Sequence, residues 1–65
     1  MVGIFETSRS LHKRHAFDGK TFANYDEAIA YIGEDRIVYH EKDEDHPGCG
    51  DVFMKNGILF AIEVI

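Results

Sequence analysis

The stretch VFMKNGILFAIEVI, residues 52–65, decides the fold class of this chain. Its turn pair, Asn56-Gly57, is preferred for a two-residue type I′ turn, because both positions of that turn need a positive φ. Apolar runs flank the pair on both sides, so the stretch predicts a β-hairpin with strands at 52–55 and 58–65. In that register the directly opposed pairs are Phe53 with Phe60 and Met54 with Leu59.

The second strand of this hairpin is apolar on both faces. Alternate residues of a strand point to opposite sides of a sheet. One side would carry Ile58, Phe60, Ile62 and Val64, and the other Leu59, Ala61 and Ile65. A strand with two apolar sides needs a covering layer on each side of its sheet.

Upstream of the hairpin, further segments have strand character. Asp18-Gly19 has the same turn chemistry as Asn-Gly and predicts a second hairpin, which joins residues 11–17 to residues 20–23. Residues 1–7 and residues 36–42 each contain β-branched and aromatic side chains and predict two more strands.

One helix is predicted between the hairpins, from Tyr25 to Ile32. Asn24 suits the N-cap position, and Glu27 at the third helical position could reach back to the Asn24 amide, as in a capping box. Apolar residues recur at helical spacing and form one stripe, which consists of Tyr25, Ala28, Ile29 and Ile32. Gly33 suits the left-handed residue that ends many helices. About two turns of helix persist only when they pack on a sheet.

These elements predict an α+β fold, with a small antiparallel sheet of four to six strands, one short helix packed on one face, and a single domain over residues 1–65. Because a two-turn helix covers only one face, the other apolar side of the final strand is left over. The N-terminal segment, a second copy of the chain or a binding partner would have to cover it. Apolar surface that stays exposed usually marks an interface.

Length and composition exclude some classes of protein. At 65 residues the chain is near the lower limit for folding without staples, and Cys49 is its only cysteine, so a disulfide within the chain is excluded. No run approaches the roughly 20 apolar residues that span a bilayer, and the first residues lack the pattern of a signal peptide. We therefore expect no membrane partner, and a lone free thiol favours the cytoplasm.

The formal net charge of −5 is unevenly distributed. Residues 1–24 carry four basic and two acidic side chains, whereas residues 25–65 carry three basic and ten acidic ones. An acidic body repels nucleic-acid phosphates and attracts basic protein surfaces, so we expect no direct nucleic-acid partner. Two interpretations of the basic segment Arg9–Arg14 stay open: contact with RNA or DNA, and pairing with the acidic half of a second copy.

The densest polar run is the segment from Glu41 to His46. A solvated connection, kept extended by repulsion between its charges, is the simple interpretation. The alternative is an anionic prong that enters a basic groove of another protein, with spaced carboxylates in place of phosphates. Glu34 and Asp35 would add to this prong if the fold brings them close.

Histidine and cysteine residues suggest a metal site. His40, His46 and Cys49 have the spacing H-x5-H-x2-C, with His12 and His15 upstream. Zinc takes thiolate and imidazole ligands, but its usual structural sites use Cys-x-x-Cys or helical His-x3-His pairs, and the chain has neither. We therefore expect no metal and no cofactor, and we keep a zinc-binding module as the second alternative.

Catalysis is not expected. Cys49 lies between two glycines, and His46 is close enough in sequence to act as its base. Nucleophilic catalysis also needs a pocket that excludes water and a group that orients the base, and a chain of this size rarely builds both.

The leading hypothesis is a non-catalytic protein-binding module, an inhibitor or adaptor that docks on a basic surface of a larger, nucleic-acid-binding protein. Acidic and aromatic side chains would form the contact surface: Glu34, Asp35, Tyr39, Glu41, Asp43, Glu44, Asp45, Phe53 and Phe60. In size and acidity the chain resembles phage-encoded inhibitors of bacterial defence nucleases, which include anti-CRISPR and DNA-mimic proteins. That resemblance, of type and not of motif, implies the same mode of action. The first alternative is a small regulatory homodimer, in which a second copy covers the leftover apolar face.

Overall fold

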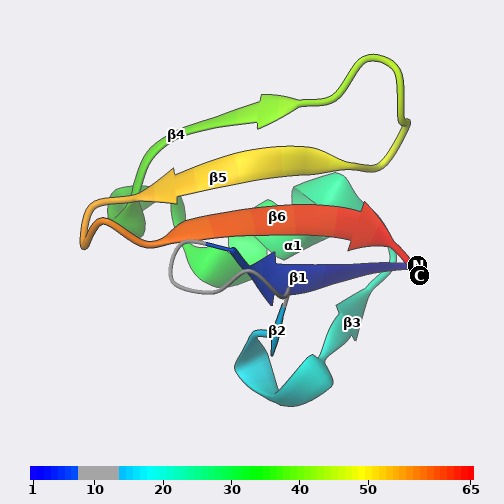
Figure 1. Cartoon of the computed structure of the whole chain (residues 1–65), viewed down its shortest axis with the longest axis horizontal. Coiled ribbons are helices and arrows are strands. Elements are labelled where there is room, and N and C mark those ends of the chain that lie inside the picture. The colour runs from blue at the N-terminus through cyan, green and yellow to red at the C-terminus, as the bar shows by residue number, and fades with distance from the viewer. Residues whose placement is uncertain (8–13) are drawn as a thin grey trace.

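Within the described residues, six strands form one antiparallel sheet, and a single α-helix packs on one of its faces (Figure 1). The computed structural model describes residues 1–7 and 14–65. The strands are β1 (Val2–Glu6), β2 (Arg14–His15), β3 (Thr21–Phe22), β4 (Ile37–Lys42), β5 (Gly50–Met54) and β6 (Leu59–Val64). The helix is α1 (Tyr25–Ile32), and two short 3₁₀ turns are η1 (Phe17–Gly19) and η2 (Glu34–Arg36). The predicted α+β class is confirmed.

The first and last strands pair at the centre of the sheet. The strand order is β2-β1-β6-β5-β4, and β3 pairs with β1 beside β2. The β1–β6 ladder runs from Val2 opposite Val64 to Glu6 opposite Phe60. The N-terminus and C-terminus lie side by side (Figure 1), and the Ile65 N–H donates to the Met1 carbonyl at 3.0 Å. The centre of the fold therefore depends on a pairing between the two ends of the chain.

The core lies between α1 and the sheet. The apolar stripe of the helix is buried as predicted, at Tyr25, Ala28, Ile29 and Ile32. It packs on alternate residues of the sheet, chiefly Val2, Ile4, Phe22, Ile37, Val52, Met54, Phe60 and Ile62. No described polar or charged residue is buried. No helix of the described residues has the length and apolar character needed to cross a membrane.

The helix bounds and the two cap residues, Asn24 and Gly33, agree with the sequence pattern, but the predicted contact of Glu27 does not. The Asn24 Oδ1 atom accepts a hydrogen bond from the Glu27 N–H at 2.9 Å. The Glu27 carboxylate accepts from the Ala23 N–H at 3.2 Å, one residue before the amide that the capping-box pattern predicted. At the other end, the Gly33 N–H donates to the Ile29 carbonyl at 3.0 Å.

The C-terminal hairpin is confirmed, but its predicted register is wrong by one residue. Phe53 lies opposite Leu59, and Val52 lies opposite Phe60. The Met54 N–H donates to the Ile58 carbonyl at 2.9 Å, so the turn holds three residues, with a positive φ only at Gly57 (86°). A three-residue hairpin loop ends in such a left-handed residue. Because side chains alternate along a strand, this one extra turn residue places Phe53 and Phe60 on opposite faces.

The predicted second hairpin is also wrong. β2 and β3 do not pair with each other, because both pair with the same edge of β1: Phe5 opposite His15, and Gly3 opposite Thr21. Residues 16–20 leave the ladder between them through η1, where Phe17, Asp18 and Gly19 all have positive φ. The turn at Asp18-Gly19 is therefore real, but its flanks form one interrupted strand along β1. The predicted strand over 11–17 lies partly outside the described residues. The predicted strands over 1–7 and 36–42 are confirmed as β1 and β4.

The observed register predicts different costs for the same substitution at Phe60 and Phe53. Phe60 is 7% exposed and packs beneath α1, whereas Phe53 is 38% exposed on the opposite face. Phe60→Ala should lower the free energy of unfolding by about 3–5 kcal/mol, the usual cost of removing a core phenylalanine. Phe53→Ala should lower it by about 1 kcal/mol or less, because partly exposed side chains lose little on truncation.

Urea denaturation of the two variants beside the parent chain measures this difference. If the Phe60→Ala variant is already unfolded without urea, its circular dichroism spectrum shows that loss of structure, and the larger cost at Phe60 is still detected. Equal costs, or a larger cost for Phe53→Ala, would contradict the register.

Candidate protein-interaction surface

The face of the sheet opposite α1 is covered by no described element. Figure 1 shows this face toward the viewer, with α1 behind the sheet. We call it the outer face, and it carries the side chains that alternate with the core residues of β1, β4, β5 and β6. They are Phe5, Tyr39, Glu41, Asp51, Phe53, Leu59, Ala61 and Glu63.

An exposed aromatic pair lies on the β4–β5 part of the outer face. Tyr39 and Phe53 are directly opposed across the two strands, and Leu59 lies opposite Phe53 on β6. The Tyr39 and Phe53 rings stack with centroids 4.8 Å apart and an interplanar angle of 8°. Tyr39 is 50% exposed. A stacked, half-exposed pair of rings is a rigid apolar surface of the kind that anchors protein interfaces.

Two carboxylates lie directly opposite one another next to this aromatic pair. Glu41 on β4 is paired in register with Asp51 on β5, and both residues are exposed. Neither makes an ion pair with another described residue. The next residue of β4, Lys42, points to the other face and pairs with Asp26 at 3.5 Å. Like charges that oppose each other across a ladder destabilise a sheet, so this pair costs folding free energy that no described cation offsets.

The other face of β4 is tied to the helix. The Tyr25 hydroxyl and the His40 Nδ1 atom are 3.0 Å apart. Burial raises the pKa of Tyr25, and the charges of Asp26, Asp51 and Glu41 raise it further, so the phenol keeps its proton and can donate to the imidazole.

Gly50 lets the Tyr25 ring lie close to β5. A Cβ atom at position 50 would lie only 2.6 Å from the Tyr25 ring. The missing side chain therefore allows the Tyr25 ring to pack on the helix side of the β4–β5 ribbon.

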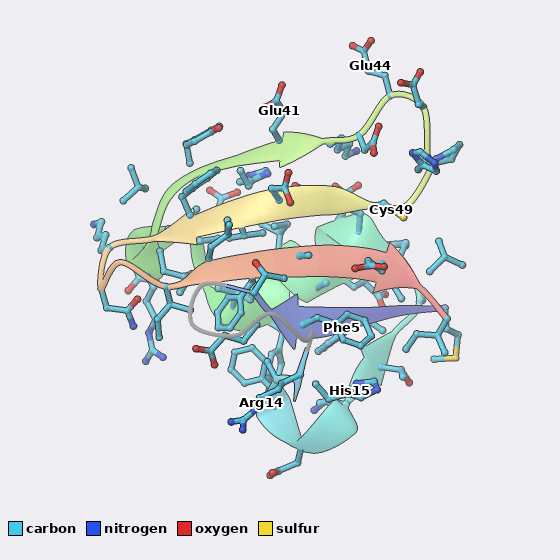
Figure 2. All side chains as sticks on the ribbon, viewed as in Figure 1. Phe5, Arg14, His15, Glu41, Glu44 and Cys49 are labelled. Atoms are coloured by element: carbon cyan, nitrogen blue, oxygen red, sulfur yellow. The ribbon has the colours of Figure 1, made fainter. Side chains whose placement is uncertain are left out.

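The polar loop 43–49 is a compact turn. Asp43 N–H donates to the Cys49 carbonyl at 2.9 Å, and Cys49 N–H donates to the His46 carbonyl at 3.0 Å. The Asp43 carboxylate accepts from the Asp45 N–H at 3.0 Å, and its second oxygen lies 3.0 Å from His46 Nδ1. These two contacts, the backbone one first, lower the pKa of Asp43. The segment is therefore a closed loop and not a connection that charge repulsion keeps extended. Glu44 lies at the outer end of this loop (Figure 2).

The structure separates some of the residues that the sequence grouped together. Glu34 and Asp35 belong to η2, before β4, whereas the acidic loop follows β4 (Figure 1). A six-residue strand spans roughly 20 Å, so these acids do not join the loop carboxylates. Phe60 is a core residue, and its ring does not face a partner. Tyr39, Glu41 and Phe53 do lie together.

Asp51 belongs to the same surface but was missed by the sequence analysis. The predicted strand began at Val52, one residue after it. The available signal was the i, i+2 spacing of Asp51 and Phe53, which places both side chains on one face of a strand.

A shallow depression of about 380 Å³ lies between the loop and the outer face, and Asp43, His46, Cys49, Asp51 and Glu63 are among its lining residues. No hydrogen bond joins the Cys49 thiol to the His46 imidazole in the part of the chain that the structure describes. The His46 side chain is 72% exposed, so water reaches it freely.

The predicted metal ligands do not converge. His40 faces α1, whereas His46 and Cys49 belong to the loop. Across residues 1–7 and 14–65, no group of three or more histidine, cysteine, aspartate or glutamate residues has the arrangement of a metal site. His12 lies outside the described residues.

Comparison with known proteins identifies no relative of the chain. No protein-family model matches the chain, and neither the curated proteins nor the solved structures include a significant match.

The loop contacts predict that the Asp43 carboxyl titrates below its ordinary pKa. Because the folded pKa is lowered, the contribution of this group to loop stability is present above its ordinary pKa and is lost as the pH falls through the folded value. His46→Ala should raise the pKa of Asp43 part of the way, since the Asp45 N–H bond remains. Carbon-detected NMR titration measures both effects. An ordinary pKa for Asp43 in the parent chain, or no change in His46→Ala, would contradict the contacts.

Proposed function

We propose that this chain is a non-catalytic protein-binding module, an inhibitor or adaptor that docks its outer face on a basic surface of a larger protein. One observation carries the proposal: the exposed Tyr39–Phe53 stack lies beside the Glu41–Asp51 pair, which no described cation offsets, on a sheet face that no described element covers. Apolar anchors next to fixed charges are the usual composition of a specific interface.

The two parts of the surface have different roles in this proposal. Burial of the Tyr39 and Phe53 rings against a partner supplies affinity, because aromatic side chains bury a large area at a low cost in conformational entropy. The Glu41–Asp51 pair supplies orientation and speeds association, since a cation of the partner relieves the repulsion between the two carboxylates.

The charge of the outer face supports a basic protein as the partner. A basic surface large enough to receive it is typical of proteins that bind nucleic acid. By occupying that surface the chain would compete with phosphates, which is how inhibitors of the DNA-mimic type act. The single thiol, Cys49, supports placing this interaction in the cytoplasm.

Paired charge reversals test the proposal. Glu41→Lys with Asp51→Lys changes the outer face, and Glu34→Lys with Asp35→Lys makes the same change in net charge on η2. A partner is captured on the immobilised parent chain from an extract of the source organism, then purified. Its affinity is measured by surface plasmon resonance at two salt concentrations.

The outer-face reversal should weaken binding by about tenfold or more and reduce its salt dependence, because charge pairs across an interface are worth that much. The η2 reversal should have little effect beyond the change in net charge. Tyr39→Ala with Phe53→Ala should raise the dissociation rate. Equal effects of the two charge reversals would contradict docking through the outer face.

The same protein samples also distinguish a foreign partner from the alternative, a homodimer. Sedimentation of the parent chain at micromolar concentrations gives a monomer if the outer face is kept for a foreign partner. A dimer that dissociates on Tyr39→Ala with Phe53→Ala would favour self-association instead.

A further inference from the structure

The edge of the sheet at β4 presents unpaired backbone groups next to the outer face. β4 is the last strand in the order β2-β1-β6-β5-β4, and no described strand lies beyond it (Figure 1). The Asp43 N–H donates to the Cys49 carbonyl, and Glu41 lies opposite Asp51 in the same ladder. Hydrogen-bonded residues alternate in an antiparallel ladder. Tyr39, Glu41 and Asp43 therefore bond toward β5, and His40 and Lys42 direct their N–H and C=O groups outward.

The devices that usually protect such an edge are weak at this position. A lysine on an edge strand and a bulge both discourage pairing with another chain. The Lys42 ammonium lies over the Tyr25 ring, 5.4 Å from its centroid, and pairs with Asp26, so it turns toward the helix and away from the edge. The irregularity lies between Ile37 and Tyr39, so the ladder from Tyr39 to Lys42 is uninterrupted.

The side chains in and next to the segment from Tyr39 to Lys42 suit a neighbouring strand that is apolar and basic. Val38 is 64% exposed, and Tyr39 is half exposed. Glu41 is exposed on the outer face and pairs with no described cation. A strand added to β4 would place one of its residues opposite Glu41 and another opposite Tyr39.

A second copy of the chain does not meet this requirement. When two identical strands pair about a two-fold axis, residues on one face oppose residues on the same face. Glu41 lies on the outer face, whereas His40 and Lys42 lie on the helix face. In a symmetric β4–β4 pairing Glu41 would therefore oppose Tyr39, Glu41 or Asp43, and its charge would meet no cation.

We propose that β4 accepts an extended segment of the partner protein as an additional strand, with arginine or lysine opposite Glu41 and an apolar residue opposite Tyr39. Backbone bonds to His40 and Lys42 supply part of the affinity, and Glu41 selects the basic residue, as in other cases of strand addition. This inference rests on the proposed function and specifies how the partner is bound.

A synthetic peptide tests strand addition without knowledge of the partner. The probe is the capped peptide Thr-Arg-Thr-Val-Thr-Arg-Thr, titrated into the isotopically labelled full chain and followed by NMR and amide hydrogen exchange. We expect saturable binding, with exchange of the His40 and Lys42 amides slowed by about tenfold or more at saturation, since they gain hydrogen-bond acceptors. The same peptide N-methylated at its threonines, which would lie opposite His40 and Lys42, keeps its charge but loses the donors that face β4, and it should not bind.

Two variants of one residue provide the matched control in the protein. Lys42→Pro removes an outward N–H, and proline is tolerated on an edge strand where its missing donor faces solvent. Lys42→Ala removes the same side chain but keeps the N–H. Lys42→Pro should weaken peptide binding by about tenfold relative to Lys42→Ala, the value of one good hydrogen bond. Unchanged chemical shifts in β1 and β6 verify that both variants fold.

The outcomes separate this inference from the proposed function. Equal binding of the N-methylated peptide, or shifts on the outer face without protection of His40 and Lys42, would overturn strand addition and leave docking through side chains. Absence of peptide binding would overturn it as well, while capture of a partner and its sensitivity to Glu41→Lys with Asp51→Lys would still decide the proposed function.

Discussion

Eight residues of helix have to cover a six-stranded sheet, and the rest of the structure depends on that shortage. A sheet with residues apolar on both sides needs two covering layers, and α1 is the one layer that the described residues provide. The fold therefore concentrates its large buried side chains beneath the helix, where Ile4, Val52 and Ile62 are fully buried. On the opposite side, Phe5, Leu59 and Ala61 stay partly accessible.

One side chain of α1 also contacts the β4–β5 ribbon. Tyr25 reaches across Gly50 to His40, so the β4–β5 ribbon is anchored from the helix side. Side chains on the outer face take no part in this attachment. Tyr39 and Glu41 are therefore not needed for the core, which leaves them available for a binding surface.

The outer face carries features that folding alone does not explain. The Glu41–Asp51 pair opposes two negative charges in one ladder, and Tyr39 is half exposed to water. The opposed charges are unfavourable in the isolated chain, and the exposed ring leaves apolar area unburied, whereas a partner that brings a cation and an apolar surface makes both favourable. For a chain of this size, with little stability in reserve, this conflict between local chemistry and folding is the strongest argument for association.

The sequence by itself determined the features that depend on neighbouring residues. The ends of α1 follow from Asn24, Gly33 and the apolar stripe, and β1, β4 and the C-terminal hairpin follow from local composition and turn pairs. These choices are made within a few residues, where capping, helical spacing and turn chemistry act directly.

Only the tertiary structure decided the features that depend on pairing between distant residues. One extra residue in the turn at Gly57 moved Phe53 to the outer face and Phe60 to the core, and local chemistry could not distinguish the two registers. β2 and β3 both pair with the edge of β1, and therefore they do not pair with each other across the turn at Asp18-Gly19. The same non-local pairing placed Asp51 beside Glu41, because the partner of a strand residue is chosen by the whole sheet and not by its neighbours in sequence.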